Sequence, residues 1–482
     1  MNEARQPLRS VVVMGSGQVG VLAAIAVKRA LPSCDVTIIA HQPRSADFAE
    51  YAASALPFTN RLHARLGVRE DEILVKAGGS HRLIERLFDW GGKGQHGAVA
   101  YGDVSAQGAA AFARQWGGGS RSAAHENPPD SLVEMLANEG RFARPQPSVQ
   151  SPLHGIEYAL RWNAGAYLQV LIQHARDIGI SYRDAPLSDV RIGETGAVGS
   201  VHLESGEDFA ADLYLDCSGG ARLLVGRLDA AGDNCSHGDA RRIVVARPGQ
   251  PMLALEDRLT LTPHGWLREF AGRDGLQQTL GLALSSGPDE ACRSLGLDPI
   301  GDCIVQPGAL KNCWSHNVVA LGNAAAQCEP LGNYHVDLAH RMIGLLVEML
   351  PGRVIEPTER AEFNRRAKLM IRSVWEITAL HHQSPASGGM VPVEKCGTRA
   401  AHTIDQFSRR GRLPHYDEQP LSGLEKQGLL RALGFHAGTP PQCRSMAHDA
   451  ASRVEKRFAA QARAVVAETP FYSQWLSRHL RG

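Results

Sequence analysis

Uninterrupted apolar runs and amphipathic stretches follow one another from the start of the chain. The run at 10–14 predicts a fully buried strand, and the apolar stretch at 21–31 predicts a mostly buried helix. A second apolar run, at 35–40, predicts another strand. The chain therefore opens with a predicted strand–turn–helix–strand unit, the arrangement typical of nucleotide-binding α/β folds.

The same pattern predicts further elements along the chain. Short alternating segments predict a hairpin that ends in a strand, whereas longer periodic segments predict helices. The predicted elements are helical pieces such as 81–90, a flexible glycine-rich stretch at 116–130, a helix at 164–178, the hairpin and strand at 199–216, a strand at 317–322, a helix at 335–350, and long amphipathic helices at 357–381 and 451–480.

The order of these elements predicts the fold class. A nucleotide-binding unit begins the chain, and strands ending in small residues return near 217 and 322, as in large FAD-binding folds. We expect an α/β protein with an FAD-binding, doubly wound (Rossmann-like, three-layer) domain, an inserted β-sheet and a helical substrate or C-terminal lobe. The expected domains are 1–350, with insertions around 85–150 and 230–310, and a helical region at 351–482.

A Gly-x-Gly-x-x-Gly turn follows the first strand. Gly15 permits the tight turn, Gly17 lets backbone N–H groups approach a pyrophosphate, and Gly20 lets the helix lie close to the strand. A glycine turn that binds no phosphate is the alternative. The cofactor-binding candidates here and at the later strand ends are Gly15, Ser16, Gly17, Val19, Gly20, Ala40, Ser218, Gly219 and Gly322. Ala40 stands where an acidic residue usually binds the ribose.

Composition excludes several classes of protein. The 482 residues include 51 Lys and Arg against 50 Asp and Glu, so charge does not indicate binding to nucleic acid or to an anionic membrane. No apolar run is long enough for a membrane span, and we expect no signal peptide. The nine cysteines form no C-x-x-C pair, which predicts a reducing cytoplasmic location and neither disulfides nor a metal site.

Four segments carry a resemblance to a known family. They are Tyr158–Leu171, similar to Y-x-[WY]-H-F-D-A-x-L-x-x-x-L; Asp212–Leu224, similar to D-L-F-[IV]-D-C-S-G-F-R-G-L-L; Asn317–Leu331, similar to N-C-V-A-I-G-x-A-x-x-F-x-E-P-L; and Glu362–Arg365, similar to R-F-N-x. In combination they resemble the flavin-dependent tryptophan halogenases, from about residue 9 to 385.

The resemblance implies FAD as cofactor, a separate flavin reductase as partner and a small aromatic or amino-acid-derived substrate, in secondary metabolism. In that family oxidised halide travels through a tunnel to a lysine beside the substrate. A glutamate assists the halogenation by polarising the oxidant or taking the ring proton. The resemblance also implies flavin contacts at Pro330, Leu331 and Gly332.

The chain departs from the family at the residues that perform the chemistry. Arg82 stands in the position of the lysine, and an arginine stays protonated and forms no N-halo amine. Gly332 stands in the position of the second glutamate of E-P-L-E-S-T-G, and His335 is the nearby residue able to substitute. The catalytic candidates are therefore Arg82, Glu329 and His335. The structural alternatives are an exposed helical Arg82 paired with Glu85, and a Glu329 that braces the turn.

Other family patterns are also altered. Glu50–Pro57 occupies the place of the flavin strap G-x-G-E-A-T-x-P, and 258–263 keeps only the proline of W-x-W-x-I-P. Arg161 and Asn163 replace the histidine and aspartate of Y-x-W-H-F-D-A.

Three functions stay open. The first is an FAD-dependent oxidoreductase or monooxygenase with changed chemistry. The second is a catalytically degenerate scaffold that binds a partner enzyme, and the third is a divergent aryl halogenase. A homodimer is compatible with each of them.

Overall fold

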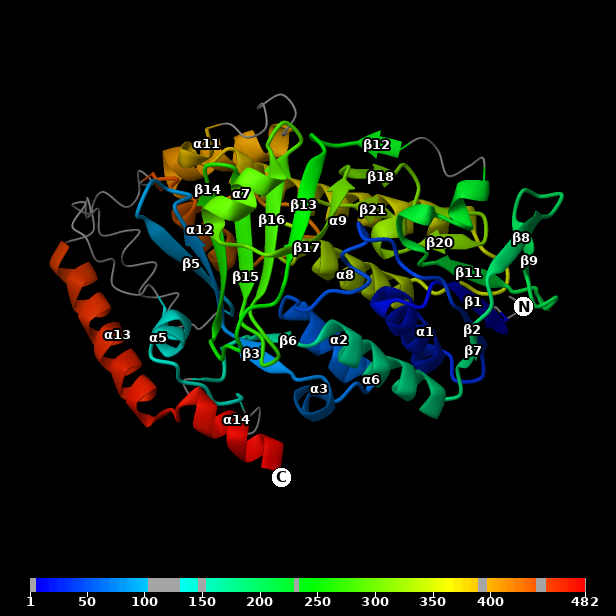
Figure 1. Cartoon of the computed structure of the whole chain (residues 1–482), viewed down its shortest axis with the longest axis horizontal. Helices are drawn as coiled ribbons and strands as arrows, with labels where there is room; N and C mark the ends of the chain where they lie inside the picture. Colours follow the sequence, from blue (N-terminus) through cyan, green and yellow to red (C-terminus); the bar gives the residue numbers. More distant parts are fainter. Residues whose placement is uncertain are drawn as a thin grey trace.

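The computed structural model describes residues 6–102, 131–145, 153–228, 234–388, 397–438 and 448–481. The glycine-rich stretch predicted at 116–130 lies outside these residues. Figure 1 shows an elongated molecule in which the N-terminal α/β part and a second, larger sheet lie side by side.

A largely parallel sheet forms the N-terminal part. Among the described residues it has six strands in the order β19-β20-β11-β1-β2-β7, of which only the edge strand β19 runs antiparallel to its neighbour. Its strands are β1 (Ser10–Met14), β2 (Asp35–Ile39), β7 (Ser181–Arg183), β11 (Leu213–Asp216), β19 (Trp314–Ser315) and β20 (Val318–Ala320). The continuous valine run of β1 suits a strand buried on both faces.

Helices cover this sheet and join it to the rest. α1 contacts β1, β2 and β11, and it also packs against α2, α6 and α8. The helices of this part are α1 (Gln18–Ala30), α2 (Phe58–Leu66), α3 (Glu70–Lys76), α6 (Ala164–Asp177), α8 (Tyr334–Glu348) and α9 (Pro357–His382). The predicted helices at 164–178, 335–350 and 357–381 are confirmed within two residues at each end.

The larger sheet has seven strands in the described part of the chain, in the order β17-β13-β16-β15-β14-β4-β5. Its strands are β4 (Ile84–Phe88), β5 (His96–Ala100), β13 (Arg241–Ala246), β14 (Glu256–Thr262), β15 (Gly265–Phe270), β16 (Gln277–Ala283) and β17 (Pro299–Val305). All neighbouring pairs are antiparallel except β4 and β14, which are parallel.

Helical structure at 81–90 is a wrong prediction. This segment forms β3 (Ser80–Arg82), which pairs with β6 (Ala159–Arg161), and then β4. Pairing of β4 with β14 and β5 on both sides outweighs the local helical pattern, because tertiary contacts override weak local propensity.

Smaller elements complete the structure. The predicted hairpin is confirmed as β9 and β10 next to β8, and a separate small sheet contains β12, β18 and β21. These elements are β8 (Leu187–Ile192), β9 (Val198–Leu203), β10 (Asp208–Phe209), β12 (Asn234–Ser236), β18 (Gly308–Leu310), β21 (Ala326–Gln327), α5 (Leu132–Asn138), α7 (Pro288–Leu295), α11 (Thr398–Arg410), α12 (Gly423–Ala432), α13 (His448–Glu468) and α14 (Tyr472–Arg481). The single helix predicted at 451–480 is wrong, because Pro470 cannot continue α13 and a second helix begins at Tyr472.

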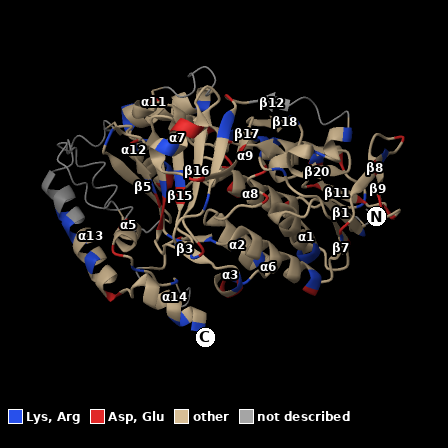
Figure 2. Ribbon diagram, viewed as in Figure 1, with Lys and Arg blue, Asp and Glu red and all other residues tan. Residues whose placement is uncertain are grey.

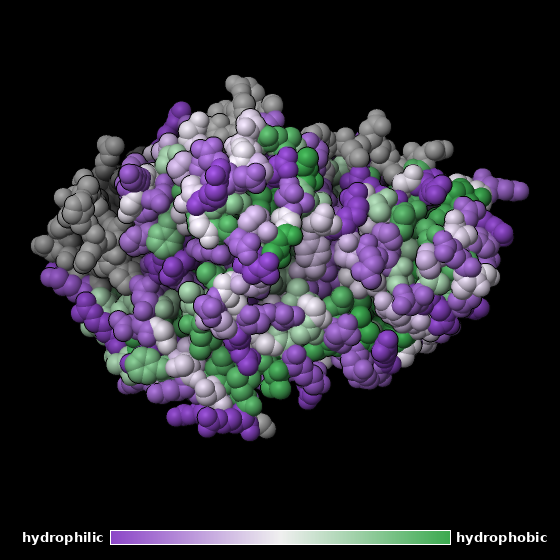
Figure 3. Space-filling model, in the orientation of Figure 1, coloured by the Kyte–Doolittle hydropathy of each residue, from purple (hydrophilic) through white to green (hydrophobic). Residues whose placement is uncertain are grey.

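One hydrophobic core extends from Leu8 to Leu433 and contains side chains of both sheets. The predicted boundary at 350 therefore falls within a stretch that shares this core, and it stays a prediction. Hydrophilic side chains cover most of the face in Figure 3, with small hydrophobic areas between them. Basic and acidic residues are mixed along most elements (Figure 2), in keeping with the balanced charge.

None of the described helices is both long and apolar enough to cross a membrane. Within the same residues, no three His, Cys, Asp or Glu side chains gather in a way that could bind a metal ion.

Candidate functional site

The glycine turn after β1 has the tight geometry that its sequence predicts. Gly15 has φ +121°, a conformation that favours glycine, and a Cβ at this position would collide with the Cys217 carbonyl. A Cβ at Gly20 would likewise collide with the Gly15 carbonyl. The turn, the first turn of α1 and the end of β11 are thus in direct backbone contact.

Three strand ends meet at this edge of the sheet. β1, β11 and β20 are parallel neighbours, so the candidates Gly15, Ser218 with Gly219, and Gly322 lie beyond their carboxyl ends. Ser218 is fixed by its hydroxyl, which donates to Asp216 at 2.6 Å. The structure therefore brings together residues more than three hundred positions apart, where open α/β sheets bind their ligands.

The end of β2 supplies the remaining candidates. Ala40 follows β2 and donates its N–H to the Arg183 carbonyl at 2.8 Å. The Ser16 hydroxyl donates to the His41 carbonyl at 3.4 Å. No carboxylate stands at Ala40 or His41 to bind a ribose, as the sequence already indicates.

Glu50 lies directly over the glycine turn. Its carbonyl accepts from the Gln18 N–H at 3.0 Å, and its Oε2 accepts from the Val19 N–H at 3.2 Å. A Cβ at Gly17 would collide with this carboxyl group. Glu50 is only 1% exposed, and burial raises its pKa to about 8, against the lowering effect of the Val19 N–H.

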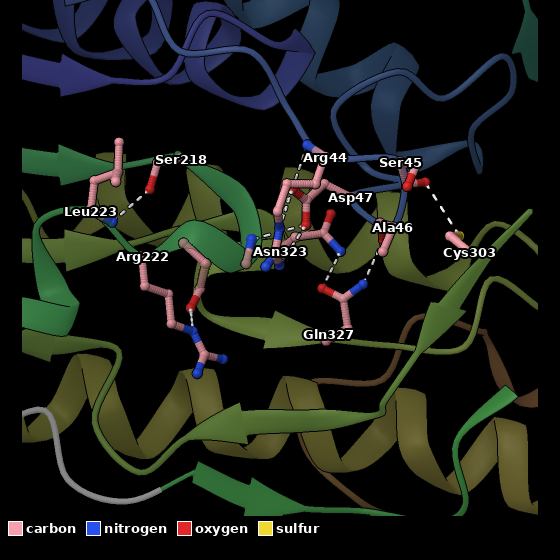
Figure 4. A network of polar contacts seen from close by, with 12 residues as sticks. Arg44, Ser45, Ala46, Asp47, Ser218, Arg222, Leu223, Cys303, Asn323 and Gln327 are labelled. Carbon is pink, nitrogen blue, oxygen red and sulfur yellow. Dashed lines mark hydrogen bonds and ion pairs between the residues drawn. The ribbon is translucent and has the colours of Figure 1, made fainter. Parts of the chain in front are cut away.

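Residues 44–49, which precede Glu50, are held by further polar contacts, shown in Figure 4. Asp47 accepts from the Gly220 N–H at 2.9 Å and from the Arg44 N–H at 2.9 Å. Asn323 accepts from the Ala49 N–H at 3.1 Å, and Gln327 donates to the Ala46 carbonyl at 2.5 Å. We call residues 44–50 the covering segment.

The backbone of this site fits a dinucleotide such as FAD. The N–H groups at the start of α1 and the small residues at the three strand ends offer an anion-binding cradle at a helix N-terminus. The covering segment fills that cradle, with Glu50 against Gly17 and Gly322 and Asp47 against Gly219. FAD thus fits the backbone only when the covering segment lies elsewhere.

Arg82 lies in the interior on β3, so an exposed helical arginine is a wrong prediction. Its Nη1 donates to Asp257 Oδ2 at 2.6 Å and its Nη2 to the Ala55 carbonyl at 2.8 Å, while its guanidinium lies 5.2 Å from the Tyr101 ring centroid. Burial disfavours its charge, but Tyr101, Asp257 and Glu85 outweigh this effect and hold the pKa of Arg82 above its usual value.

Asp257 bonds to residues from three separate segments of the chain. Its second oxygen accepts from Arg161 Nη1 at 3.0 Å, so one carboxylate pairs with two buried arginines. Ser54 donates to Asp257 at 3.4 Å and accepts from Asn333 at 3.3 Å. These contacts join Arg82, Arg161, Asp257, Ser54 and Asn333 into one buried polar network.

Glu329 is held by three partners. Trp266 Nε1 donates to one oxygen at 2.6 Å, His382 Nε2 bonds the other at 2.7 Å, and Arg241 Nε lies 3.6 Å away. Burial alone would raise the pKa of Glu329, but His382, Arg241 and Trp266 outweigh it and hold the pKa at about 2. These contacts fix the Glu329 carboxylate between β13, β15 and the end of α9.

The turn after Glu329 leaves no room for a side chain at Gly332. Gly332 has φ +68°, and a Cβ there would meet the Tyr334 ring at 2.6 Å. Pro330 and Leu331 are buried in this turn, and Arg268 donates to the Pro330 carbonyl at 3.3 Å. His335 is buried in the first turn of α8, where burial and then Arg268 lower its pKa to about 3.

Asp257 and Arg268 are members of the network that no sequence motif indicated, and Glu85, expected only as the partner of an exposed Arg82, is buried near them. This burial raises the pKa of Glu85 against the effects of Arg82 and Arg268. No local motif marks these residues, because strand pairing alone brings them together. Such an arrangement offers a fixed cation and a buried carboxyl group for proton transfer.

A separate cavity of about 650 Å³ lies on the other face of β4 and β14. Its lining includes Arg86, Phe88, Glu256 and Arg258, whose side chains alternate along the strands with Glu85 and Asp257. The sheet therefore separates this cavity from the buried network.

Comparisons with known proteins agree with this architecture. The family model described as tryptophan halogenase matches residues 10–270 and 283–420. The chain is 21% identical over 418 residues to tryptophan 7-halogenase KtzQ of Kutzneria sp. (strain 744), covering 78% of this chain and 76% of that protein. It is 23% identical to tryptophan 6-halogenase SttH of Streptomyces toxytricini, with 78% of each chain covered.

Solved structures show the same fold. BrvH, a flavin-dependent halogenase from Brevundimonas sp. BAL3, superposes with a TM-score of 0.83 at 24% identity, covering 98% of this chain and 99% of that one. Xcc4156, a flavin-dependent halogenase from Xanthomonas campestris, gives 0.83 at 20% identity, with coverage of 98% and 99%. The predicted fold class is thereby confirmed.

The shared carboxylate of Asp257 predicts a large effect on stability. Asp257→Asn leaves Arg82 and Arg161 buried without an ionised partner, so we expect the free energy of unfolding to fall by about 3 kcal/mol. The control Asp302→Asn removes an exposed pair with Arg242 and should cost less than about 1 kcal/mol. Urea denaturation measures both, and equal small losses would contradict this account.

The lowered pKa of Glu329 predicts a pH dependence of stability. Its ionised form stabilises the folded state above the unfolded-state pKa of 4.5, and this contribution disappears as the pH falls towards 2. The stability difference between the unsubstituted chain and Glu329→Gln should therefore shrink by about 3 kcal/mol between neutral pH and about pH 2. Denaturation at several pH values measures this difference. A difference in unfolding free energy that stays constant from neutral pH to about pH 2 would contradict the ion pairing of Glu329.

Proposed function

This chain belongs to the tryptophan halogenase family, and from that premise we propose that it is an FAD-dependent oxidoreductase or monooxygenase whose substrate is a small aromatic or amino-acid-derived molecule. FAD is the cofactor of this flavin-dependent family. A flavin reductase is the partner that would supply the reduced cofactor, and the ordinary family halogenation is not the reaction.

The immobilised guanidinium of Arg82 carries the proposal. It is bonded to Asp257 and to the Ala55 carbonyl, so it is a fixed cation without a free amine. A lysine in this place could bond covalently to an oxidised halide, whereas an arginine only donates hydrogen bonds. Gly332, packed against Tyr334, offers no carboxylate in place of the family glutamate.

The residues of this chain then have separate roles. Amides at the start of α1, with Ser218, Gly219 and Gly322, would hold the pyrophosphate side of the cofactor. When bound, FAD supplies the redox chemistry, and the protein orients it. Arg82 would stabilise negative charge on a reacting oxygen, and Glu85 would hold or release a proton beside it.

A catalytically degenerate scaffold is a second candidate, and the covering segment favours it. Glu50 and Asp47 fill the cradle that FAD requires. A chain that stays colourless and does not quench FAD fluorescence at any concentration tested would favour this scaffold over both enzymatic functions.

A halide-controlled assay tests the proposed reaction. The purified chain, FAD, a flavin reductase and NADH are incubated with tryptophan and related aromatic compounds, with and without chloride or bromide, and products are identified by mass spectrometry. We expect an oxygenated product, with dissolved O₂ as the oxidant of the reduced flavin, or a dehydrogenated product, with oxidised FAD accepting the two electrons. Either forms equally without halide, because no residue at Arg82 or Gly332 can direct an oxidised halide.

Arg82→Gln keeps a polar side chain with N–H donors, shortens it and removes its charge. We expect it to lower the rate of product formation by about 100-fold with a smaller change in KM. A halogenated product that requires halide would overturn the proposal in favour of a divergent halogenase.

A further inference from the structure

The covering segment lies over the glycine turn after β1 and over the loops that follow β11 and β20. We infer that residues 44–50 are a built-in competitor of FAD, in which the Glu50 carboxyl group takes the anion position at the N-terminus of α1. This inference rests on the proposed use of FAD. It makes Glu50 a residue that sets the affinity for the cofactor, and it gives this chain a closed state that must open before FAD binds.

The position of the carboxyl group is the first support. A pyrophosphate at a helix N-terminus accepts hydrogen bonds from the N–H groups of the first turn. In this chain the Val19 N–H donates to Glu50 Oε2 and the Gln18 N–H to the Glu50 carbonyl. The same carboxyl group lies between Gly17 and Gly322, so both close-approach glycines are covered by one side chain.

The hydrogen bonds along the segment are the second support. Asp47 is fully buried and caps the Gly220 N–H, while Asn323 and Gln327 hold Ala49 and Ala46. Figure 4 shows Asn323 and Gln327, which follow β20, beside the segment, and Asp47 of the segment accepts from the Gly220 N–H in the loop after β11. The contacts come from the cofactor-binding edge itself, so the segment and the dinucleotide compete for the same groups.

The burial of the Glu50 carboxyl group destabilises the closed state relative to an open one. Glu50 Oε1 is buried and has no hydrogen-bond partner among the residues that the structure describes, and the whole carboxyl group is removed from water. An unsatisfied buried polar atom disfavours the arrangement that buries it. Binding of a dinucleotide can therefore displace residues 44–50 from the site.

A protein that is mostly closed binds its ligand with an affinity reduced by the open fraction. Removing the competing carboxyl group should consequently raise the affinity for FAD without adding any contact to it. The strap pattern of the family places a glycine where this chain has Glu50, which makes Glu50→Gly the natural test substitution.

The experiment measures FAD and ADP binding by isothermal titration calorimetry for the unsubstituted chain, Glu50→Gly, Asp47→Ala and the exposed control Glu207→Gly. We expect Glu50→Gly and Asp47→Ala each to bind both ligands about tenfold more tightly, and the control to be unchanged. Glu50→Gln keeps an acceptor for the Val19 N–H and should change the affinity less than about threefold.

Unchanged or weaker binding of FAD and ADP to both folded variants, Glu50→Gly and Asp47→Ala, would overturn the inference. Asp47→Ala keeps the test decisive if Glu50→Gly fails to fold, which thermal unfolding detects. ADP binding does not depend on flavin chemistry. Tighter binding by the variants with no turnover would therefore contradict the proposed function and leave this inference standing.

Discussion

The contact between the glycine turn and the end of β11 is the constraint on which the rest of the site depends. Gly15 has no space for a side chain beside the Cys217 carbonyl, and Gly20 has none beside Gly15. Because β1, β11 and β20 are parallel neighbours, this contact also places the loops after β11 and β20 at the N-terminus of α1. The covering segment then bonds to those same loops, so closure and cofactor binding use one set of groups.

The second sheet imposes a different constraint, which is the pairing of buried charge. Arg82 and Arg161 are both buried beside Asp257, and a buried ion costs several kcal/mol unless it is paired. Arg82 of β3, Arg161 of β6 and Asp257 of β14 therefore form one salt-bridge network. Glu329 is likewise bound to Trp266 and His382.

Local patterns were sufficient to predict the first βαβ unit, the hairpin at 199–216 and the helices α6, α8 and α9. Each of these elements has a strong periodicity or a distinct turn within its own residues. β4 was mistaken for a helix because its strand character comes from β14, more than 160 residues later. The break before α14 was marked by Pro470, a local signal that the prediction of one long helix overlooked.

Site residues were predictable only where they lie in a recognisable sequence motif. Gly15, Gly17 and Gly20 carried such a motif, and the resemblance located Arg82 and Glu329. Asp257 carried none, since its partners Arg82 and Arg161 lie 175 and 96 residues away in sequence. The role of Glu50 depends on how a loop folds back over a turn, which composition and spacing do not determine.

A pair of crystal structures, of the free chain and of the chain grown with saturating FAD, tests the central claim most directly. The account predicts that Glu50 bonds the Val19 N–H in the free chain, and that in the complex the cofactor pyrophosphate takes this place while residues 44–50 move away. A bound FAD with Glu50 still on Val19, or a free chain with an open cradle, would contradict it.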